Sequence, residues 1–224
     1  MAVTFSGRFN PTGRFRVGPA GGAVATDPLW SSVKLLLDGE GDPFYANKAT
    51  GGEYTAFTLG GPGPGRFGSG FNITYSAIQL PTSGGLYGGD FTMEMWVYYT
   101  GVPIGGYYTC LLQSQNMVIY QDRSFASYEG SIYRSPAGVI KLNEWSHVAL
   151  VREGTASGNC SLYADGAKVA SFSSMGYFYT GGLLGGYTLT TYKLNGFLDD
   201  IRISTVARYS GDTYTVPTSP HPVG

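Results

Sequence analysis

The chain has 224 residues and a formal net charge of −1, and its charged fraction of 13% is well below the ~25% that is usual in soluble domains. This balance gives no general attraction to nucleic acid, and no run approaches the ~20 apolar residues of a membrane-spanning helix. We therefore expect neither a nucleic-acid partner nor insertion into a membrane. The 35 glycines and 18 tyrosines suit short strands joined by tight turns.

Residues 1–26 differ from the rest of the chain. They carry Arg8, Arg14 and Arg16, and no acidic residue precedes Asp27. Two readings stay open. The segment is a flexible leader, or it is an extended arm that becomes ordered on a partner, with the arginines as anchors. Because Met1 to Asn10 has no apolar core, we expect no classical signal peptide.

The next segment predicts one helical turn followed by a strand. Thr26 or Asp27 caps the turn, and Pro28 takes its first position. Val33–Leu37 is a short apolar run typical of a strand. An acidic turn from Asp38 to Pro43 follows it.

A glycine- and proline-rich stretch, Gly60–Gly70 (GGPGPGRFGSG), predicts a loop between strands. Phe71–Leu80 then predicts one strand, which ends at Pro81. Phe91–Tyr99 alternates well but has large side chains on both faces. We expect it to be a central strand that is covered on both sides.

The stretch from Asn143 to Phe172 gives the clearest architecture. Trp145–Arg152 and Cys160–Ala164 predict two strands, and Asp165-Gly166 predicts a type I′ turn before a returning strand at Lys168–Phe172. The remaining strand-like runs are Cys110–Gln121, Ser131–Arg134, Gly181–Tyr187 and Leu194–Ser204. The last 20 residues predict an extended tail along the surface.

About a dozen short strands without helical periodicity predict an all-β, two-sheet antiparallel sandwich. We divide the chain into an extended arm (residues 1–26), the sandwich (27–215) and a C-terminal tail (216–224). The two cysteines, Cys110 and Cys160, both lie in strand-like runs. Two buried thiols and one bridge between strands both fit this pattern.

Six segments in order resemble the laminin-G-like subgroup of concanavalin-A-like jelly rolls. These segments are Val33–Gly39, Arg66–Phe71, Phe91–Val97, Glu144–Leu150, Leu162–Gly166 and Gly196–Ile203. Together they cover roughly residues 27 to 215. The resemblance implies a jelly-roll sandwich with an extended N-terminal arm.

A narrower resemblance is to the copies of this domain in tailed-phage virion proteins. It rests on Asp27–Trp30, Arg202–Ser204, Ala207–Tyr209, Pro217 and Pro220. It implies a place on the virion surface, with the protein made in the host cytoplasm. The arm with Arg8, Arg14 and Arg16 would then dock to other capsid or tail proteins, and we expect a homo-oligomer.

The sequence does not indicate a catalytic function. Glucanases of this fold use a Glu-x-Asp-x-x-Glu strand, because retaining hydrolysis needs paired carboxylates, and the chain has no such triplet. It also has no Gly-x-Ser-x-Gly elbow. We expect His147 to be a hydrogen-bonded core residue, and His221 lies in the tail.

Asp199 is the most informative carboxylate. Simple alternation puts it on one face with Phe197, Ile201 and Ile203, where an unpaired carboxylate would be costly. Related sandwiches bind calcium near this position, so the resemblance implies a calcium site at Asp199 with oxygens from Asp38 to Asp42. The alternative is an Asp199 carboxylate that is hydrogen-bonded to backbone amides.

Exposed aromatic rings could stack on sugars. The candidates are Tyr107, Tyr108, Tyr128, Tyr133, Tyr177, Phe178, Tyr179 and Tyr192. The loop with Tyr177, Phe178 and Tyr179 is the first choice, and packing within or between subunits is the alternative. We expect a non-enzymatic virion surface protein that contacts host-surface glycans, or else a stand-alone calcium-dependent lectin.

Overall fold

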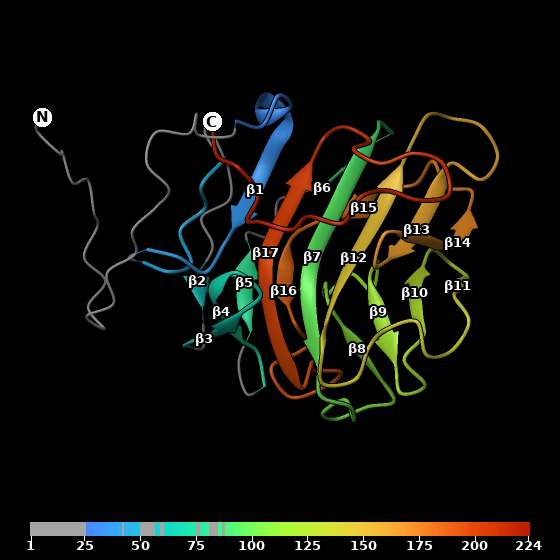
Figure 1. Cartoon of the computed structure of the whole chain (residues 1–224). Coiled ribbons are helices and arrows are strands. Elements are labelled where there is room, and N and C mark those ends of the chain that lie inside the picture. Colours follow the sequence, from blue (N-terminus) through green and yellow to red (C-terminus); the bar gives the residue numbers. More distant parts are fainter. Residues whose placement is uncertain are drawn as a thin grey trace, which may run out of the picture.

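The computed structural model describes residues 26–41, 43–49, 57–58, 61–74, 77–80, 85–86 and 88–224. These residues form an all-β sandwich of two layers, as Figure 1 shows, and the predicted fold class is confirmed. The first layer is an eight-stranded antiparallel sheet. Its strands are β1 (Val33–Leu37), β3 (Pro62–Gly65), β4 (Gly68–Asn72), β7 (Phe91–Tyr99), β12 (Trp145–Arg152), β13 (Cys160–Ala164), β14 (Ala167–Phe172) and β17 (Gly196–Ser204).

The second layer consists of three smaller antiparallel sheets. Four strands form one of them: β8 (Tyr108–Cys110), β9 (Val118–Tyr120), β10 (Phe125–Tyr128) and β11 (Ile132–Arg134). Three form the next: β2 (Phe57–Thr58), β5 (Ile78–Leu80) and β16 (Gly182–Leu184). Two form the last: β6 (Gly85–Leu86) and β15 (Phe178–Tyr179). Apolar side chains from both layers meet in one core, which includes Met93, Leu150 and Phe125.

The large sheet runs in the order β14-β13-β12-β7-β17-β4-β3, and β1 pairs with β17 as well. The predicted strands at Phe91–Tyr99, Trp145–Arg152 and Cys160–Ala164 have the observed bounds. Eight of the nine residues of β7 are buried, so the predicted cover on both faces is confirmed. Asp165 and Gly166 have φ of 46° and 84°, which fits the type I′ turn.

Two expectations about the glycine-rich region were wrong. The predicted loop Gly60–Gly70 is not a loop over its described residues 61–70, because they contain the hairpin of β3 and β4. A Cβ on Gly65 would lie 2.5 Å from the Ser69 carbonyl oxygen, so glycine allows the two strands to approach. The proline residues fit because β3 is the edge strand of the sheet. Phe71–Leu80 is likewise not one strand, since β4 and β5 belong to different layers.

The run Cys110–Gln121 is also divided. It contains the end of β8 and all of β9, joined by a turn. Cys110 and Cys160 are free thiols, and both are fully buried. Burial raises the pKa of Cys110 to about 12 and that of Cys160 to about 11, as expected for inert thiols.

The C-terminal segment, residues 205–224, lies across the outer face of β17, β7 and β12 (Figure 1). The Tyr214 amide donates to the Gly166 carbonyl, and the Lys168 amide donates to the Asp212 carbonyl. Tyr209 and Tyr214 stack on each other and pack over Ala149 and Tyr163. The predicted tail along the surface therefore completes the cover of this sheet.

The predicted helical turn is a short 3₁₀ helix, Trp30–Ser32. It begins after Leu29, whose amide donates to the Asp27 carboxylate. Among the described residues, no helix has the length and apolar character needed to cross a bilayer.

Candidate functional site

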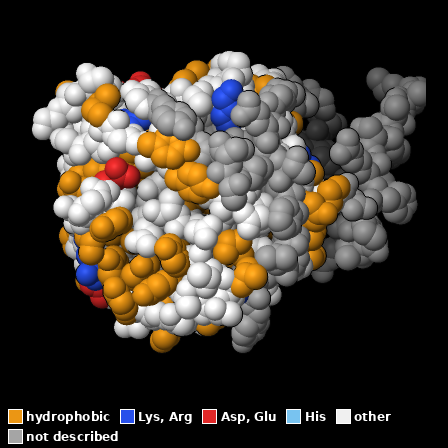
Figure 2. Space-filling view, turned by 180° about the vertical axis from the view of Figure 1, so that it is seen from behind, with side chains coloured by type: hydrophobic (Ala, Val, Ile, Leu, Met, Phe, Trp, Pro, Cys, Tyr) orange, Lys and Arg blue, Asp and Glu red, His pale blue; other side chains and the backbone are white. Residues whose placement is uncertain are grey.

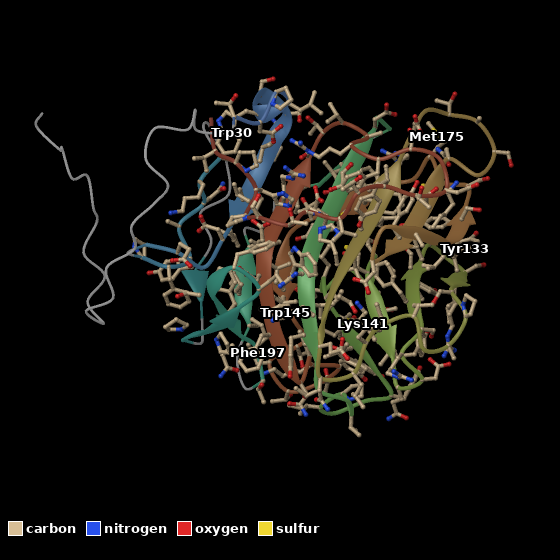
Figure 3. The ribbon with its side chains drawn as sticks, viewed as in Figure 1. Trp30, Tyr133, Lys141, Trp145, Met175 and Phe197 are labelled. Atoms are coloured by element: carbon tan, nitrogen blue, oxygen red, sulfur yellow. The ribbon has the colours of Figure 1, made fainter. Side chains whose placement is uncertain are left out.

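An open groove of about 630 Å³ lies on the outer face of the large sheet, beside the C-terminal segment. We call it the Trp145 groove. Its walls are Arg66, Trp96, Tyr98, Lys141, Asn143, Glu144, Trp145, Asp165 and Val216. Figure 3 shows Trp145, Lys141 and Phe197 on this face of the ribbon. The volume is in the range of small-molecule sites.

The floor of the groove is aromatic because β7, β12 and β17 lie side by side in register. Trp145 pairs with Tyr98, and Tyr98 pairs with Phe197. The Tyr98 ring centroid lies 5.5 Å from that of Trp145 and 5.8 Å from that of Phe197. All three rings are half-buried, and Tyr98 and Trp145 line the groove, whereas Phe197 lies next to it and packs on Tyr98.

Polar groups of both signs surround this floor. Lys141 Nζ lies 3.0 Å from Asp165 Oδ2. The Arg66 guanidinium carbon lies 4.7 Å from the centre of the Trp96 ring. Asn143 and Glu144 are exposed at the rim. A ring surface beside fixed donors and acceptors is suited to a ligand that has an apolar face and hydroxyl groups at its edge.

The local sequence patterns did not predict this groove, although they contain one signal of it. Alternation in Phe91–Tyr99 puts Trp96 and Tyr98 on one face, and Trp145 begins the next predicted strand. What the alternation does not give is the pairing of β7 with β12 and β17, which brings the rings together.

Only part of the predicted contact loop at Tyr177, Phe178 and Tyr179 is exposed for contact with a ligand. Phe178 is fully buried and its ring packs on Phe91, so its prediction as a contact residue was wrong. The reason is that Phe178 begins β15, which pairs with β6 in the second layer. Tyr177 is exposed and its ring centroid lies 6.1 Å from that of Tyr179, and a contact role for these two stays a prediction.

A second aromatic surface lies on the opposite layer, the side seen in Figure 2, where hydrophobic side chains gather. Tyr108 and Tyr192 stack with centroids 4.3 Å apart, and the exposed Tyr107 packs on both. The Arg134 guanidinium lies 4.0 Å from the centre of the Tyr120 ring. None of these rings lines the Trp145 groove, which combines a hollow with charged groups at its rim and is therefore the preferred site.

Asp199 does not face the apolar core, and the expectation from simple alternation was wrong. A bulge between Asp199 and Arg202, with Asp200 at a φ of 49°, adds one residue to β17 opposite β7. Ile201 and Ile203 therefore enter the core, while Asp199 lies on the outer face with Phe197.

The Asp199 carboxylate accepts hydrogen bonds from the amides of Phe67 and Asp200, as the alternative reading expected. Burial, together with the negative charge of Asp38 nearby, raises the pKa of Asp199 to about 6. Two nearby carboxylates with raised pKa values would fit a hard cation. A calcium site at Asp199 and Asp38 stays a prediction. Asp42, and also Arg8, Arg14 and Arg16 of the arm, lie outside the described residues.

A buried polar network lies farther along the same outer face, under the C-terminal segment. Its centre is Glu94, which is fully buried on β7. Arg202 Nε donates to Glu94 Oε1 at 2.8 Å, and the Tyr209 hydroxyl donates to Glu94 Oε2. Arg202 also contacts Asp27, which forms an ion pair with Arg208 at 2.8 Å. The network therefore ties both ends of the described chain to the middle strand of the sheet.

Burial alone would raise the pKa of Glu94, but its attraction to His221, Arg202 and His147 lowers the pKa to about 2. Burial lowers the pKa of His147 to about 4 and that of His221 to about 3, so both imidazoles are neutral at pH 7. Arg202 is therefore the partner of Glu94 that remains positively charged at that pH.

The structure brings together the two histidines that lie far apart in the sequence. Nε2 of His147 and Nε2 of His221 lie 3.5 and 3.7 Å from Glu94 Oε2. The prediction of a buried His147 is confirmed, and its Nδ1 contacts the Tyr214 hydroxyl. Its Nε2, like that of His221, has no hydrogen-bond partner among the described residues, so the His147 ring is hydrogen-bonded through Nδ1 only.

Solved structures with similar folds include several binding domains. Domain 4 of AbnA, a GH43 extracellular arabinanase from Geobacillus stearothermophilus, solved with arabinotriose, has a TM-score of 0.54 and 16% identity over 79% of this chain and 93% of that one. The binding domain of Paraclostridial Mosquitocidal Protein 1 has a TM-score of 0.53 and 18% identity over 81% of this chain and 50% of that one. The binding domain of Botulinum Neurotoxin DC, solved with SialylT, has a TM-score of 0.54 and 11% identity over 81% and 50%.

At these identities the similarity shows the fold alone, and the chain spans half the length of the two toxin domains. No curated protein sequence matches the chain. The model of the laminin-G-like family, described as the Concanavalin A-like lectin/glucanases superfamily, matches residues 72–212, which is more than half of the chain. The chain therefore belongs to the laminin-G-like branch of the concanavalin A-like lectin/glucanase superfamily.

Proposed function

We propose that this protein is a non-catalytic glycan-binding domain and that the Trp145 groove is its sugar-binding site. The observation that carries the proposal is the aromatic floor of Tyr98 and Trp145, with Phe197 packed against Tyr98, beside charged groups of both signs. The apolar face of a pyranose or furanose ring can pack on such a floor, and its hydroxyl groups can reach the rim. The arabinotriose complex of a domain with this fold supports the same class of ligand.

The carboxylates at the groove support binding rather than hydrolysis. Asp165 is held in the structure, because Oδ1 accepts from the His147 amide and Oδ2 pairs with Lys141. Glu144 is exposed at the rim of the groove. Retaining hydrolysis would need two such groups about 5–5.5 Å apart in different protonation states.

Replacing Trp145 by Ala should weaken glycan binding at least about tenfold, because a central aromatic anchor usually contributes most to affinity. A broad glycan array that includes arabino- and sialyl-oligosaccharides would first identify a ligand for the wild-type protein, and isothermal titration would then compare the variants. Trp145→Phe should retain part of the affinity, since it keeps a ring on the floor.

Tyr107→Ala is the matched control, because it removes an exposed ring from the opposite layer. It should leave affinity unchanged. Loss of binding in Tyr107→Ala with full binding in Trp145→Ala would place the site on the second layer and contradict the groove. An array without any signal would contradict the proposed function itself.

We also propose that the domain is displayed on the surface of a tailed-phage particle, attached through residues 1–26. The support is the resemblance of Asp27–Trp30 and Arg202–Tyr209 to phage copies of the domain. In the structure these residues stabilise the fold, because Asp27 forms ion pairs with Arg202 and Arg208. The Tyr209 hydroxyl donates to Glu94.

Deleting residues 1–25 therefore tests the attachment. The truncated chain should keep its melting temperature, because Asp27 and its ion pairs remain. It should be lost from purified particles in an immunoblot when it is produced together with the other particle proteins. Incorporation at the wild-type level would refute attachment through the arm.

A further inference from the structure

We infer that Glu94, His147 and His221, with Asp200 beside them, form a binding site for a divalent transition-metal ion such as Zn²⁺. The site is buried between the large sheet and the C-terminal segment. It is separate from the Trp145 groove, whose walls include none of these four residues.

The distances between the ligand atoms support a metal rather than direct hydrogen bonds. Glu94 Oε2 lies 3.5 Å from His147 Nε2 and 3.7 Å from His221 Nε2, and His221 Nε2 lies 3.5 Å from Asp200 Oδ2. These separations are longer than a usual N–H···O bond of about 2.9–3.0 Å. They are close to the ~3.3–3.5 Å between neighbouring ligand atoms that bonds of about 2.0–2.1 Å give around a tetrahedral Zn²⁺ ion.

The two imidazole nitrogens have no other role in the structure. Nε2 of His147 and Nε2 of His221 are buried and have no hydrogen-bond partner in the part of the chain that the structure describes, which is costly for a polar atom. Both lie close to the same carboxylate oxygen, and the three atoms are all within 4.8 Å of one another. A bound cation would satisfy both nitrogens at once.

The surrounding contacts orient these side chains for coordination. The Tyr214 hydroxyl contacts Nδ1 of His147. When Nδ1 carries the proton of this bond, Nε2 presents its lone pair, which is the arrangement seen in histidine ligands with a supporting partner. Arg202 binds Oε1 of Glu94, while Oε2 faces the histidines and also accepts the hydrogen bond of the Tyr209 hydroxyl. The Asp200 carboxylate is held by the His221 amide.

The donor set selects the class of ion. Two neutral imidazoles and one or two carboxylates suit Zn²⁺ and its neighbours, whereas Ca²⁺ prefers six to eight oxygen ligands. A bound ion would join β7, β12 and the end of the C-terminal segment through one centre. The expected consequence is a tail that stays closed over the sheet more firmly with the ion than without it.

The test uses the full chain without a polyhistidine tag, because these two histidines are its only ones. The protein is unfolded with chelator, refolded with Zn²⁺ or Co²⁺, freed of loose metal by gel filtration and analysed for metal content. We expect about one ion per chain, a higher melting temperature and, with Co²⁺, the strong visible bands of four-coordinate cobalt. Ca²⁺ should give no such stabilisation through this site.

His221→Asn should lower the metal content at least tenfold. Asp212→Asn is the matched control on the same segment, since it removes only an exposed ion pair with Lys168 and should bind metal like the wild type. Equal metal content in His221→Asn and the wild type would overturn the site, as would a wild type that retains less than about 0.1 ion per chain. If His221→Asn does not fold, the Co²⁺ spectrum of the wild type decides, and a weak octahedral spectrum overturns the proposal.

Discussion

Replacing Arg202 by Ala is expected to lower the free energy of unfolding by about 3–5 kcal/mol, because removing one partner of a buried ion pair leaves the other charge without compensation. The Glu94 side chain is completely buried, and Arg202 contacts its Oε1 through both Nε and Nη2. Arg202 also reaches Asp27 at 3.3 Å, so its loss weakens a second contact. Urea unfolding followed by tryptophan fluorescence and circular dichroism would measure the change.

Arg134→Ala is the matched control for this variant. Arg134 pairs with Asp122 just as closely, but both side chains are substantially exposed, at 38% and 45%. Surface pairs contribute about 0–1 kcal/mol, and the exposed contact of Arg134 with the Tyr120 ring adds about 0.5–1 kcal/mol. This variant should therefore lose no more than about 2 kcal/mol. Arg202→Lys should fall between the wild type and Arg202→Ala, because it keeps the charge but loses the paired donors. Equal losses in Arg202→Ala and Arg134→Ala would show that the Glu94 network contributes little to stability.

Replacing Gly196 by Ala is expected to destabilise the fold by about 3 kcal/mol or more, because overpacking and backbone strain act together at this position. A Cβ on Gly196 would lie 1.9 Å from the Tyr98 carbonyl oxygen, and Gly196 has a φ of 156°. Gly196 begins β17 beside β7, so the clash falls where the two middle strands first pair. Differential scanning calorimetry would show a large drop in melting temperature or no cooperative transition.

Gly61→Ala is the control for Gly196→Ala. A Cβ on Gly61 would meet nothing within 4 Å, and the residue is exposed. Its melting temperature should stay within a few degrees of the wild type, as is usual for surface substitutions. If Gly196→Ala had the melting temperature of the wild type, β17 would be able to move away from β7 without a loss of stability, which would contradict the prediction.

The strands that the sequence predicted well are those with strong local patterns. Phe91–Tyr99 and Trp145–Arg152 have the expected bounds because bulky and β-branched residues recur at the spacing of a strand. The Asp165-Gly166 turn follows from the backbone preferences of its two residues. The β3–β4 hairpin was missed because its glycines and prolines resemble a loop until the pairing partner is known.

The candidate sites depend on pairing that local patterns do not contain. The bulge at Asp200 reverses the faces of Asp199 and Ile201, and it is set by the register of β17 against β7. His221 lies near Glu94 only because the C-terminal segment crosses the sheet. The Trp145 groove likewise needs three strands that are distant in sequence. The resemblance to the family predicted the jelly-roll sandwich. It did not predict these contacts, because they depend on which strands and segments lie side by side in three dimensions.

The position of β17 has a consequence for how the chain is made. This strand pairs with β7 on one side and with β4 and β1 on the other, so it joins the early strands of the sheet to the later ones. A nascent chain that has not yet reached Gly196 has no strand to fill this gap. β7 and β4 then present open edges, which are prone to pair with other chains. We therefore expect correct assembly to wait until β17 has been synthesised, and ribosome-bound chains to need protection from aggregation until β17 emerges.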